Sequence, residues 1–317
     1  MAATTSGIVT TTLNYFLPPE QGGDREYHAG TVGEKRRKYS PAEVHVKDIR
    51  GQEDYFTLDK HGFQLVKREF TEKTFNDEER IKEEYYQEVA QLIKDVTDAS
   101  KVLVGSHVVR RRSWKSAFEA EKDLPDDARS VAPSNARFVH CDQSYDGARA
   151  RIAELHPEEA DKLDKCRWAI INVWKPFDHR VTRDGLCFAD AFSIRDDELR
   201  PISIHFPKRR DSVQESGDDK KLEPPKQPDY YARDVYRIHG TIEAWQCAPP
   251  SNPDQHKWYY ASEMNPNEAL LLKIADSKRT VANKLMHTSF TGENDHGPER
   301  HSLEARCTVF WEDQPAE

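Results

Sequence analysis

The chain lacks the features that mark membrane, secreted or nucleic-acid-binding proteins. Among its 317 residues, no apolar run approaches the roughly 18 residues that a membrane helix needs. Residues 1–19 have neither a basic start nor an apolar core, so they do not resemble a secretory signal. With 47 Lys and Arg against 56 Asp and Glu, the net charge of −9 is not that of a nonspecific binder of nucleic acid or anionic membranes. These absences predict a soluble cytoplasmic protein.

Cysteine is also scarce, whereas aromatic residues are not. The five cysteines are an odd number and form no C-x-x-C pair, so neither a disulfide framework nor a zinc ribbon is expected. The 13 Phe, 12 Tyr and 6 Trp are too many for a disordered chain. The sequence therefore predicts a folded globular protein whose cysteines are all reduced.

Helical patterns concentrate in the first half of the chain and strand patterns in the second. Apolar positions three and four apart predict a helix over 77–97, capped by Asn76, and a second helix is expected over 148–165. The charged stretch 208–229 predicts a surface loop, a candidate lid. Strands are expected at 102–104, 168–174, 186–194, 201–206, 235–240, 257–260, 269–274, 285–290 and 302–311.

This distribution predicts an α+β fold with a double-stranded β-helix, or jelly-roll, core and flanking helices. Residues 1–40 are predicted to be an N-terminal arm, and residues 41–317 a single domain. The length alone permits two domains or one large β-rich domain. We favour one domain, because the candidate metal ligands described next require the central and C-terminal thirds to meet.

The motif H-x-D at His140 and Asp142 is the sharpest local feature. Residues two apart in a strand share a face, so an imidazole and a carboxylate would lie side by side. A 2-His-1-carboxylate iron site needs this pair and one distant histidine. By itself the motif also fits a surface pair, which occurs by chance in many chains. We expect His287, in an apolar strand, to be the third ligand.

A candidate anion-binding pair follows His287. The turn after this strand is rich in Gly, Asn and Asp, and we expect a hairpin that returns Arg300 to its side. A guanidinium and the hydroxyl of Ser302, two residues apart, suit the distal carboxylate of a 2-oxo acid. Arg306 falls on the same face. Asn172 is a further candidate for holding the co-substrate, although a core strand with a capped polar residue is an equal interpretation.

The combination of H-x-D, a distant histidine and R-x-S resembles the Fe(II)/2-oxoglutarate-dependent oxygenases. More narrowly, the chain is similar to the fungal gibberellin-desaturase and AsaB-like hydroxylase/desaturase family. The resemblance implies the double-stranded β-helix fold, Fe(II), 2-oxoglutarate and O₂, and a place in secondary metabolism. It leaves Arg306 as a rival of Arg300, because the interval from His287 to Arg300 is slightly longer than usual in the family. The segments that carry it are 48–51, 56–59, 62–63, 136–144, 172–176, 266–271, 287–290 and 300–306.

The predicted function is thus that of a non-haem Fe(II)/2-oxoglutarate-dependent dioxygenase. It would hydroxylate, desaturate or oxidatively cyclise a small-molecule substrate at an unactivated C–H bond, with release of succinate and CO₂. One alternative is the same chemistry on a small amino acid, with closure of an aziridine-type ring. A second is a non-catalytic β-helix module that binds a small acid. A monomer and a homodimer both stay open. The predicted metal ligands and catalytic residues are His140, Asp142 and His287, and the predicted cofactor-binding residues are Arg300, Ser302, Asn172 and Arg306.

Overall fold

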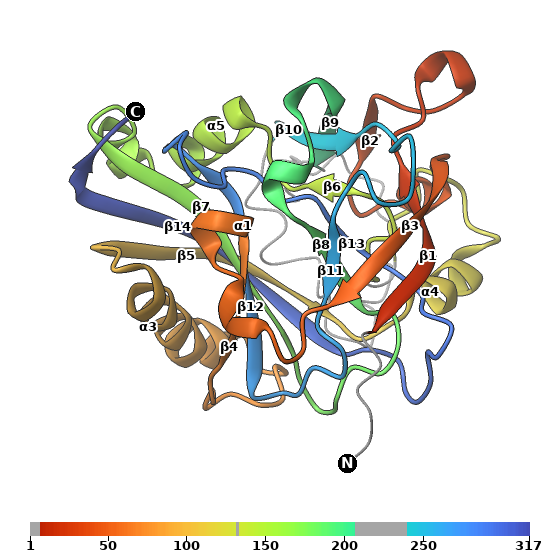
Figure 1. Cartoon of the computed structure of the whole chain (residues 1–317), viewed down its shortest axis with the longest axis horizontal. Helices are drawn as coiled ribbons and strands as arrows, with labels where there is room; N and C mark the ends of the chain where they lie inside the picture. The colour runs from red at the N-terminus through yellow and green to blue at the C-terminus, as the bar shows by residue number, and fades with distance from the viewer. Residues whose placement is uncertain (1–6, 131–132, 207–239) are drawn as a thin grey trace, which may run out of the picture.

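The computed structural model describes residues 7–130, 133–206 and 240–317, which form two β-sheets with helices around them (Figure 1). The nine-stranded sheet has the order β1-β3-β11-β8-β13-β6-β10-β9-β2, and the five-stranded sheet has the order β4-β12-β7-β14-β5. The fold is therefore a mixed α+β fold with large sheets, as predicted.

The strands are β1 (Ile8–Tyr15), β2 (Glu26–His28), β3 (Ser40–Asp48), β4 (Phe63–Lys67), β5 (Lys101–Arg110), β6 (His140–Cys141), β7 (Cys166–Pro176), β8 (Leu186–Ala189), β9 (Leu199–Phe206), β10 (Gly240–Cys247), β11 (Trp258–Tyr260), β12 (Glu268–Asp276), β13 (His287–Ser289) and β14 (Ser302–Pro315). The α-helices are α1 (Leu58–His61), α2 (Glu78–Arg80), α3 (Tyr86–Thr97), α4 (Trp114–Glu121) and α5 (Tyr145–Leu155).

The five-stranded sheet is covered on both faces. Every residue of β7 and of β12 is buried, as expected for central strands that read as nearly continuous apolar runs. One face packs against α3, where Val89 and Ile93 meet Ile171 and Val309 in an outer core. Figure 1 shows α3 along this outer face. The other face contributes to an inner core shared with the nine-stranded sheet.

The helix expected over 77–97 is confirmed, with two corrections. Asn76 does not cap it: the Asp77 carboxylate accepts hydrogen bonds from Glu79 N (3.0 Å) and Arg80 N (3.2 Å). A carboxylate in this position also matches the positive end of the helix dipole. Between α2 and α3 the helix has one π-helical turn, Ile81–Tyr85.

The second helix is shorter than the predicted 148–165. It starts after Ser144, whose Oγ accepts from Gly147 N at 2.9 Å, and ends at Leu155, because Pro157 has no N–H to continue it. A 3-10 helix, η5 (Pro157–Lys162), follows. Gly147 lets α5 approach β10, since a Cβ there would lie 2.1 Å from Glu243 O.

The predicted hairpin between His287 and Arg300 is wrong. Strand β13 pairs with β6 and β8 in the nine-stranded sheet, whereas β14 pairs with β5 and β7 in the five-stranded sheet. The turn after β13 therefore carries the chain from one sheet to the other. The strand pattern of 302–311 was read correctly, but a local pattern does not say which strand it will pair with.

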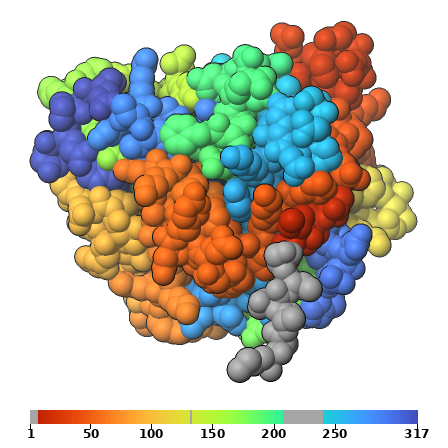
Figure 2. All heavy atoms as spheres, in the orientation of Figure 1, coloured from red at the N-terminus to blue at the C-terminus, as the bar shows by residue number. Residues whose placement is uncertain are grey.

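Residues from distant parts of the chain share the sheets. Strand β1 pairs with β3 along its whole length, and β2 pairs with β9 at the opposite edge. Strand β4 pairs with β12, and Figure 2 shows this part of the N-terminal region beside C-terminal residues on one face. The first 40 residues thus include strands at both edges of the nine-stranded sheet.

Two other sequence predictions can be compared with the structure, and two more fall almost entirely outside the described residues. All five cysteines are free, as predicted, and all are buried. Within the described ranges, every helix is too short or too polar to cross a membrane. The charged stretch 208–229 lies outside the described residues, as does all of the strand expected over 235–240 except Gly240, which begins β10.

Candidate active site

His140, Asp142 and His287 lie together inside the nine-stranded sheet. His140 in β6 and His287 in β13 are register partners, and Asp142 follows β6 directly. Asp142 Oδ1 is 3.5 Å from His140 Nε2 and 4.0 Å from His287 Nε2. One ligand atom from each residue falls within 4.8 Å of the other two. The sequence prediction that these three side chains meet is therefore matched by the geometry.

Backbone carbonyls fix the orientation of both imidazole rings. His140 Nδ1 donates to Phe138 O at 2.8 Å, and His287 Nδ1 donates to Leu285 O at 3.1 Å. A carbonyl only accepts, so each Nδ1 carries a hydrogen, and it is Nε2 that offers a lone pair in the neutral ring. Both lone pairs lie on the side of Asp142. This is the arrangement that second-shell contacts give to metal-ligating histidines.

The charges of the three groups suit a divalent metal. Burial, followed by the neighbouring His140, lowers the pKa of His287 to about 4, so that its ring is neutral at neutral pH. Burial alone would raise the pKa of Asp142, but Arg306 and the two histidines hold it well below its usual range. Two neutral imidazoles and one carboxylate are the donor set of non-haem Fe(II) sites, so the residues fit this metal.

Asn172 and Arg306 hold the outer oxygen of Asp142. Asn172 Nδ2 donates to Asp142 Oδ2 at 2.8 Å, and Arg306 Nε lies 3.5 Å from the same oxygen. Arg306 also donates to Glu304 Oε1, from Nε at 3.0 Å and from the guanidinium end at 2.9 Å. Register pairing of β7 with β14 sets Asn172 opposite Arg306. The structure thus brings these two predicted residues to the candidate metal ligands.

Arg300 makes its described hydrogen bonds to residues other than the three ligands. The Arg300 guanidinium donates to Asn135 Oδ1 at 2.7 Å and to Asp184 O, and it lies 5.2 Å from the centre of the Trp174 ring. Burial lowers its pKa to about 9. Within the described residues, Arg300 Nε and Ser302 Oγ are buried without a hydrogen-bond partner. Such unpaired groups cost about 1–3 kcal/mol each, so an incoming oxygen ligand would be stabilised there.

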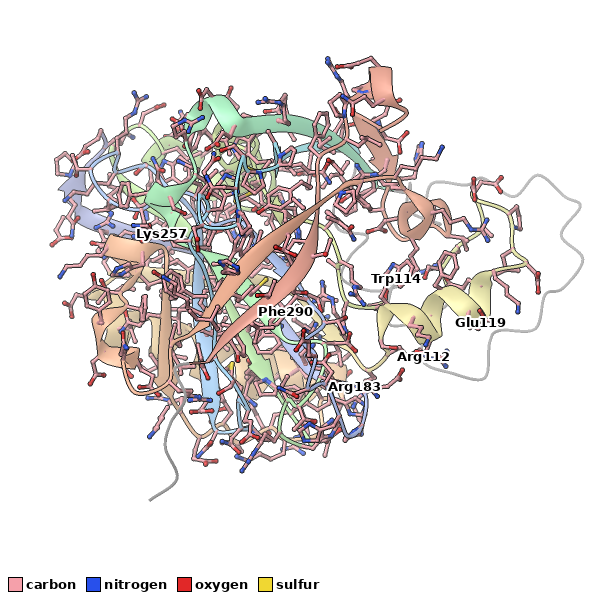
Figure 3. All side chains as sticks on the ribbon, turned by 45° about the vertical axis from the view of Figure 1, so that its right-hand side comes forward. Arg112, Trp114, Glu119, Arg183, Lys257 and Phe290 are labelled. Carbon is pink, nitrogen blue, oxygen red and sulfur yellow. The ribbon has the colours of Figure 1, made fainter. Side chains whose placement is uncertain are left out.

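A cavity of about 800 Å³ opens beside the candidate metal ligands. His140, Asp142 and Arg306 line one part of it, and the described lining does not include Arg300 or Ser302. The apolar lining includes Trp114, at the start of α4, which lies at one side of the molecule (Figure 3). Other lining residues that the sequence analysis did not identify include Tyr27, Arg37, Tyr39, Phe138, Arg110 and Arg151.

One of these residues had a weak signal in the sequence. Arg37 belongs to the basic cluster 35–38, and such clusters are usually solvated. Nothing local distinguishes it from Arg36, whose guanidinium instead bonds Asp126 at 2.6 Å. The difference arises from tertiary contacts with rings elsewhere in the chain.

Comparisons with known proteins identify the family of the chain. A family model described as "Oxidoreductase/YMDC permease-like domain" matches residues 13–310. The chain is 42% identical to hydroxylase/desaturase CTB9 of Cercospora beticola, over 96% of this chain and 87% of that protein. It is 30% identical to the alpha-ketoglutarate-dependent dioxygenase phiK of Fungal sp., over 96% of this chain and 97% of that protein.

A solved structure has the same fold. The iron and alpha-ketoglutarate-dependent endoperoxidase NvfI superposes with a TM-score of 0.71 at 22% identity, over 96% of this chain and 99% of that one. The predicted resemblance to fungal oxygenases is confirmed by these matches. The chain belongs to the oxidoreductase family of fungal hydroxylase/desaturases and 2-oxoglutarate-dependent dioxygenases.

Proposed function

We propose that the chain is an Fe(II)/2-oxoglutarate-dependent dioxygenase of fungal secondary metabolism, with His140, Asp142 and His287 as its metal ligands. It hydroxylates, desaturates or oxidatively cyclises a small molecule at an unactivated C–H bond. The single observation that carries this proposal is the convergence of three ligand atoms, two imidazole nitrogens and one carboxylate oxygen, within 4.8 Å of one another.

The chain's residues prepare the metal site before any ligand enters. Phe138 O and Leu285 O hold the two imidazoles in the tautomer that presents Nε2. Asn172 holds Oδ2 of Asp142, which leaves Oδ1 facing the histidines. When bound, Fe(II) supplies the activation of O₂ that is coupled to conversion of 2-oxoglutarate into succinate and CO₂. Three ligands from one side leave open positions for these co-substrates.

For the distal carboxylate of 2-oxoglutarate we propose Arg300 with Ser302. The support is that Arg300 Nε and Ser302 Oγ are buried and without partners in the described chain. Arg306, the rival, already makes close contacts with Glu304 and lies near Asp142. In this proposal Arg306 and Asn172 orient Asp142 and border the co-substrate. Arg300 neutralises the charge of the distal carboxylate of 2-oxoglutarate.

The finer points of fold and location are part of the same proposal. The two sheets are proposed to form a double-stranded β-helix in one catalytic domain over 41–317, with 1–40 as an arm whose strands join the sheet edges. A cytoplasmic location stays a prediction.

The cavity and the relatives bear on the two alternative functions. A cavity of about 800 Å³ favours an organic substrate larger than a small amino acid. The dioxygenase relatives disfavour a non-catalytic binding module.

The test is metal analysis combined with an assay for succinate. After anaerobic reconstitution, the wild-type protein should bind one Fe(II) and form succinate from 2-oxoglutarate. Since it removes one of three ligands, His140→Ala should lower succinate formation by more than about a thousandfold. His45→Ala, which changes a histidine paired to exposed Asp254, is the control and should match the wild type. Undiminished turnover in His140→Ala would contradict the ligand assignment.

A further inference from the structure

A buried cation lies in the same cavity as His140. Arg37 follows the 3-10 helix η2 (Gly33–Arg36), and its guanidinium carbon is 4.3 Å from the ring centre of Tyr27, 5.3 Å from that of Tyr39 and 5.6 Å from that of Phe138. We call Arg37 and these three rings the aromatic box. The Arg37 side chain is only 4% exposed. All four residues line the cavity.

The described chain supplies few partners for this guanidinium. Arg37 donates to Tyr39 Oη across a long 3.4 Å, and its Nε, 3.9 Å from the half-exposed Asp24 carboxylate, has no hydrogen-bond partner in the described residues. Glu34 lines the same cavity and interacts electrostatically with Arg37, but its Oε2 accepts from Gly30 N at 2.7 Å and burial raises the pKa of its carboxyl, which weakens its negative charge. Arginine has five N–H donors and keeps its proton. Burial with so few partners is unfavourable unless an anion completes the site.

The aromatic rings do not cancel the charge of Arg37. Burial raises the pKa of Tyr39 and raises that of Tyr27 well above its usual value, so both hydroxyls stay neutral. Their ring faces attract the cation, and this interaction holds the guanidinium in place without neutralising it. The neighbouring Arg36 differs, because it bonds Asp126 and the carbonyl oxygens of Glu121 and Lys122.

The aromatic box is joined to the candidate metal ligands through one residue. The Phe138 ring is stacked on Tyr39, with centres 5.4 Å apart and planes 7° apart, and its centre is 4.7 Å from that of the His140 ring. The same residue's carbonyl fixes His140 Nδ1. A molecule bound at Arg37 can therefore extend along Phe138 to the metal side of the cavity.

The cavity lining also has many apolar side chains. The apolar residues of the lining include Ile202 and Ile204 of β9 and Ile242 and Trp245 of β10. Such a surface stabilises the carbon skeleton of an organic ligand, while a charged group with unused donors, such as Arg37, fixes its orientation. A planar guanidinium fork matches the two oxygens of a carboxylate.

We propose that Arg37 binds a carboxylate of the organic substrate, which is therefore a hydrophobic carboxylic acid. Its acid group lies in the aromatic box, and its reacting C–H bond lies beside His140 and Asp142. This inference rests on the proposed function and adds to it the chemical class of the substrate and a specificity-determining residue.

The test compares acids with their methyl esters by calorimetry. The probes are 1-naphthoic acid, abietic acid and dodecanoic acid, each titrated into the protein beside its ester. The wild-type protein should bind at least one acid about tenfold or more tightly than the matching ester, since a charge-assisted pair is lost in the ester. In Arg37→Gln the acid and its ester should bind within about twofold of each other.

Two further variants keep the result interpretable. Arg36→Gln removes the same charge from the adjacent residue, which also lines the cavity but whose guanidinium is already bonded to Asp126, and it should keep the preference for acids. Arg37→Lys keeps the charge but loses the planar fork, and it should show a reduced preference; it decides the question if Arg37→Gln does not fold. Wild-type protein without any preference for acids, or Arg37→Gln with the wild-type preference, would overturn the proposal.

The titrations are made both with and without iron and 2-oxoglutarate, which separates the two proposals. Protein that binds no iron but prefers acids through Arg37 would refute the proposed function and keep the anion site. Protein that binds iron and forms succinate but shows no such preference would refute the anion site alone.

Discussion

The two ends of the cavity differ in how far the protein completes its own polar contacts. At the metal end, both histidine Nδ1 atoms have carbonyl acceptors and Asp142 Oδ2 has Asn172. At the other end, Arg37 is equally enclosed, but in the described residues its Nε has no hydrogen-bond partner. The first end is prepared to hold a cation in a fixed geometry. The second is prepared to receive an anion.

This difference indicates separate roles for the two ends. A metal ligand must be held in one orientation, because small displacements change the geometry around the metal. A substrate-binding group must instead retain unused donors for the molecule that enters. Arg300, which is not part of the described cavity lining, is an intermediate case: two contacts are made by the protein, and Nε has no partner among the described residues.

Arg300→Gln should have the largest effect among the variants that sharpen this comparison. Loss of the guanidinium is expected to weaken 2-oxoglutarate binding by about a hundredfold, because a charge-assisted bidentate contact is removed. Equilibrium dialysis with labelled 2-oxoglutarate measures the effect. Arg306→Gln is the matched comparison and should lose less affinity. A larger loss in Arg306→Gln would assign the distal carboxylate to Arg306 instead.

Asn172→Ala should have a smaller effect than Arg300→Gln. It acts at the metal end of the cavity, where the protein already satisfies the polar contacts of the ligands. Removal of the amide leaves Asp142 Oδ2 without its 2.8 Å hydrogen bond, and we expect iron affinity to fall about 10- to 100-fold. Competition with a chelator provides the measurement. Asn252→Ala, on an exposed loop, is the control and should leave iron affinity unchanged. If Asn172→Ala kept full iron affinity, Asp142 would not depend on this support.

Features of the fold and the site that depend on neighbouring residues could be predicted from the sequence, whereas those that depend on contacts between distant segments could not. Residues two apart in a strand share a face, so His140 and Asp142 could be paired without a structure. The apolar run of β7 was recognisable for the same local reason. The course of the chain from β13 to β14 was not, because strand partners are chosen by distant segments.

The anion site was beyond sequence reasoning for a similar reason. Arg37 and Arg36 are adjacent and chemically identical, and only their tertiary contacts distinguish them: Arg37 packs on Tyr27, Tyr39 and Phe138, whereas Arg36 bonds Asp126. Those contacts join β2, the residue just before β3 and the segment before β6. Asn172 was identified as a candidate, but its hydrogen bond to Asp142 emerges only from the arrangement of β7 beside the metal ligands.

Lys175 is a second cation that packs against aromatic rings. Its substitution should have the smallest effect on catalysis among these variants. It lies 5.2 Å from the ring centres of Phe70 and Phe75, on the side of the outer core. Burial, followed by the repulsion of Lys73, lowers the pKa of its amine to about 8. Unlike Arg37, it can therefore lose its proton and escape the cost of a buried charge. Carboxylates of Glu69, Glu88 and Asp178 act weakly in the opposite direction.

The sign of the resulting pH dependence follows from this lowered pKa. Between about pH 8 and the unfolded value near 10.5, the unfolded chain binds more protons at this site, so the free energy of unfolding rises with pH. Relative to Lys175→Met, the free energy of unfolding of the wild type should increase by on the order of 2 kcal/mol across this interval. Urea unfolding of both proteins at about pH 7.5 and about pH 10, on either side of the pKa of about 8, measures this change in the free energy of unfolding. Parallel pH profiles of the two proteins would show that the amine stays charged.

The central claim is that one iron ion is held by His140, Asp142 and His287. Anomalous X-ray scattering at the iron edge, from crystals of the anaerobically reconstituted protein, tests it most directly. The account predicts a single strong peak within bonding distance of His140 Nε2, His287 Nε2 and a carboxylate oxygen of Asp142. A peak at another place in the molecule, or none in protein that carries stoichiometric iron, would contradict it.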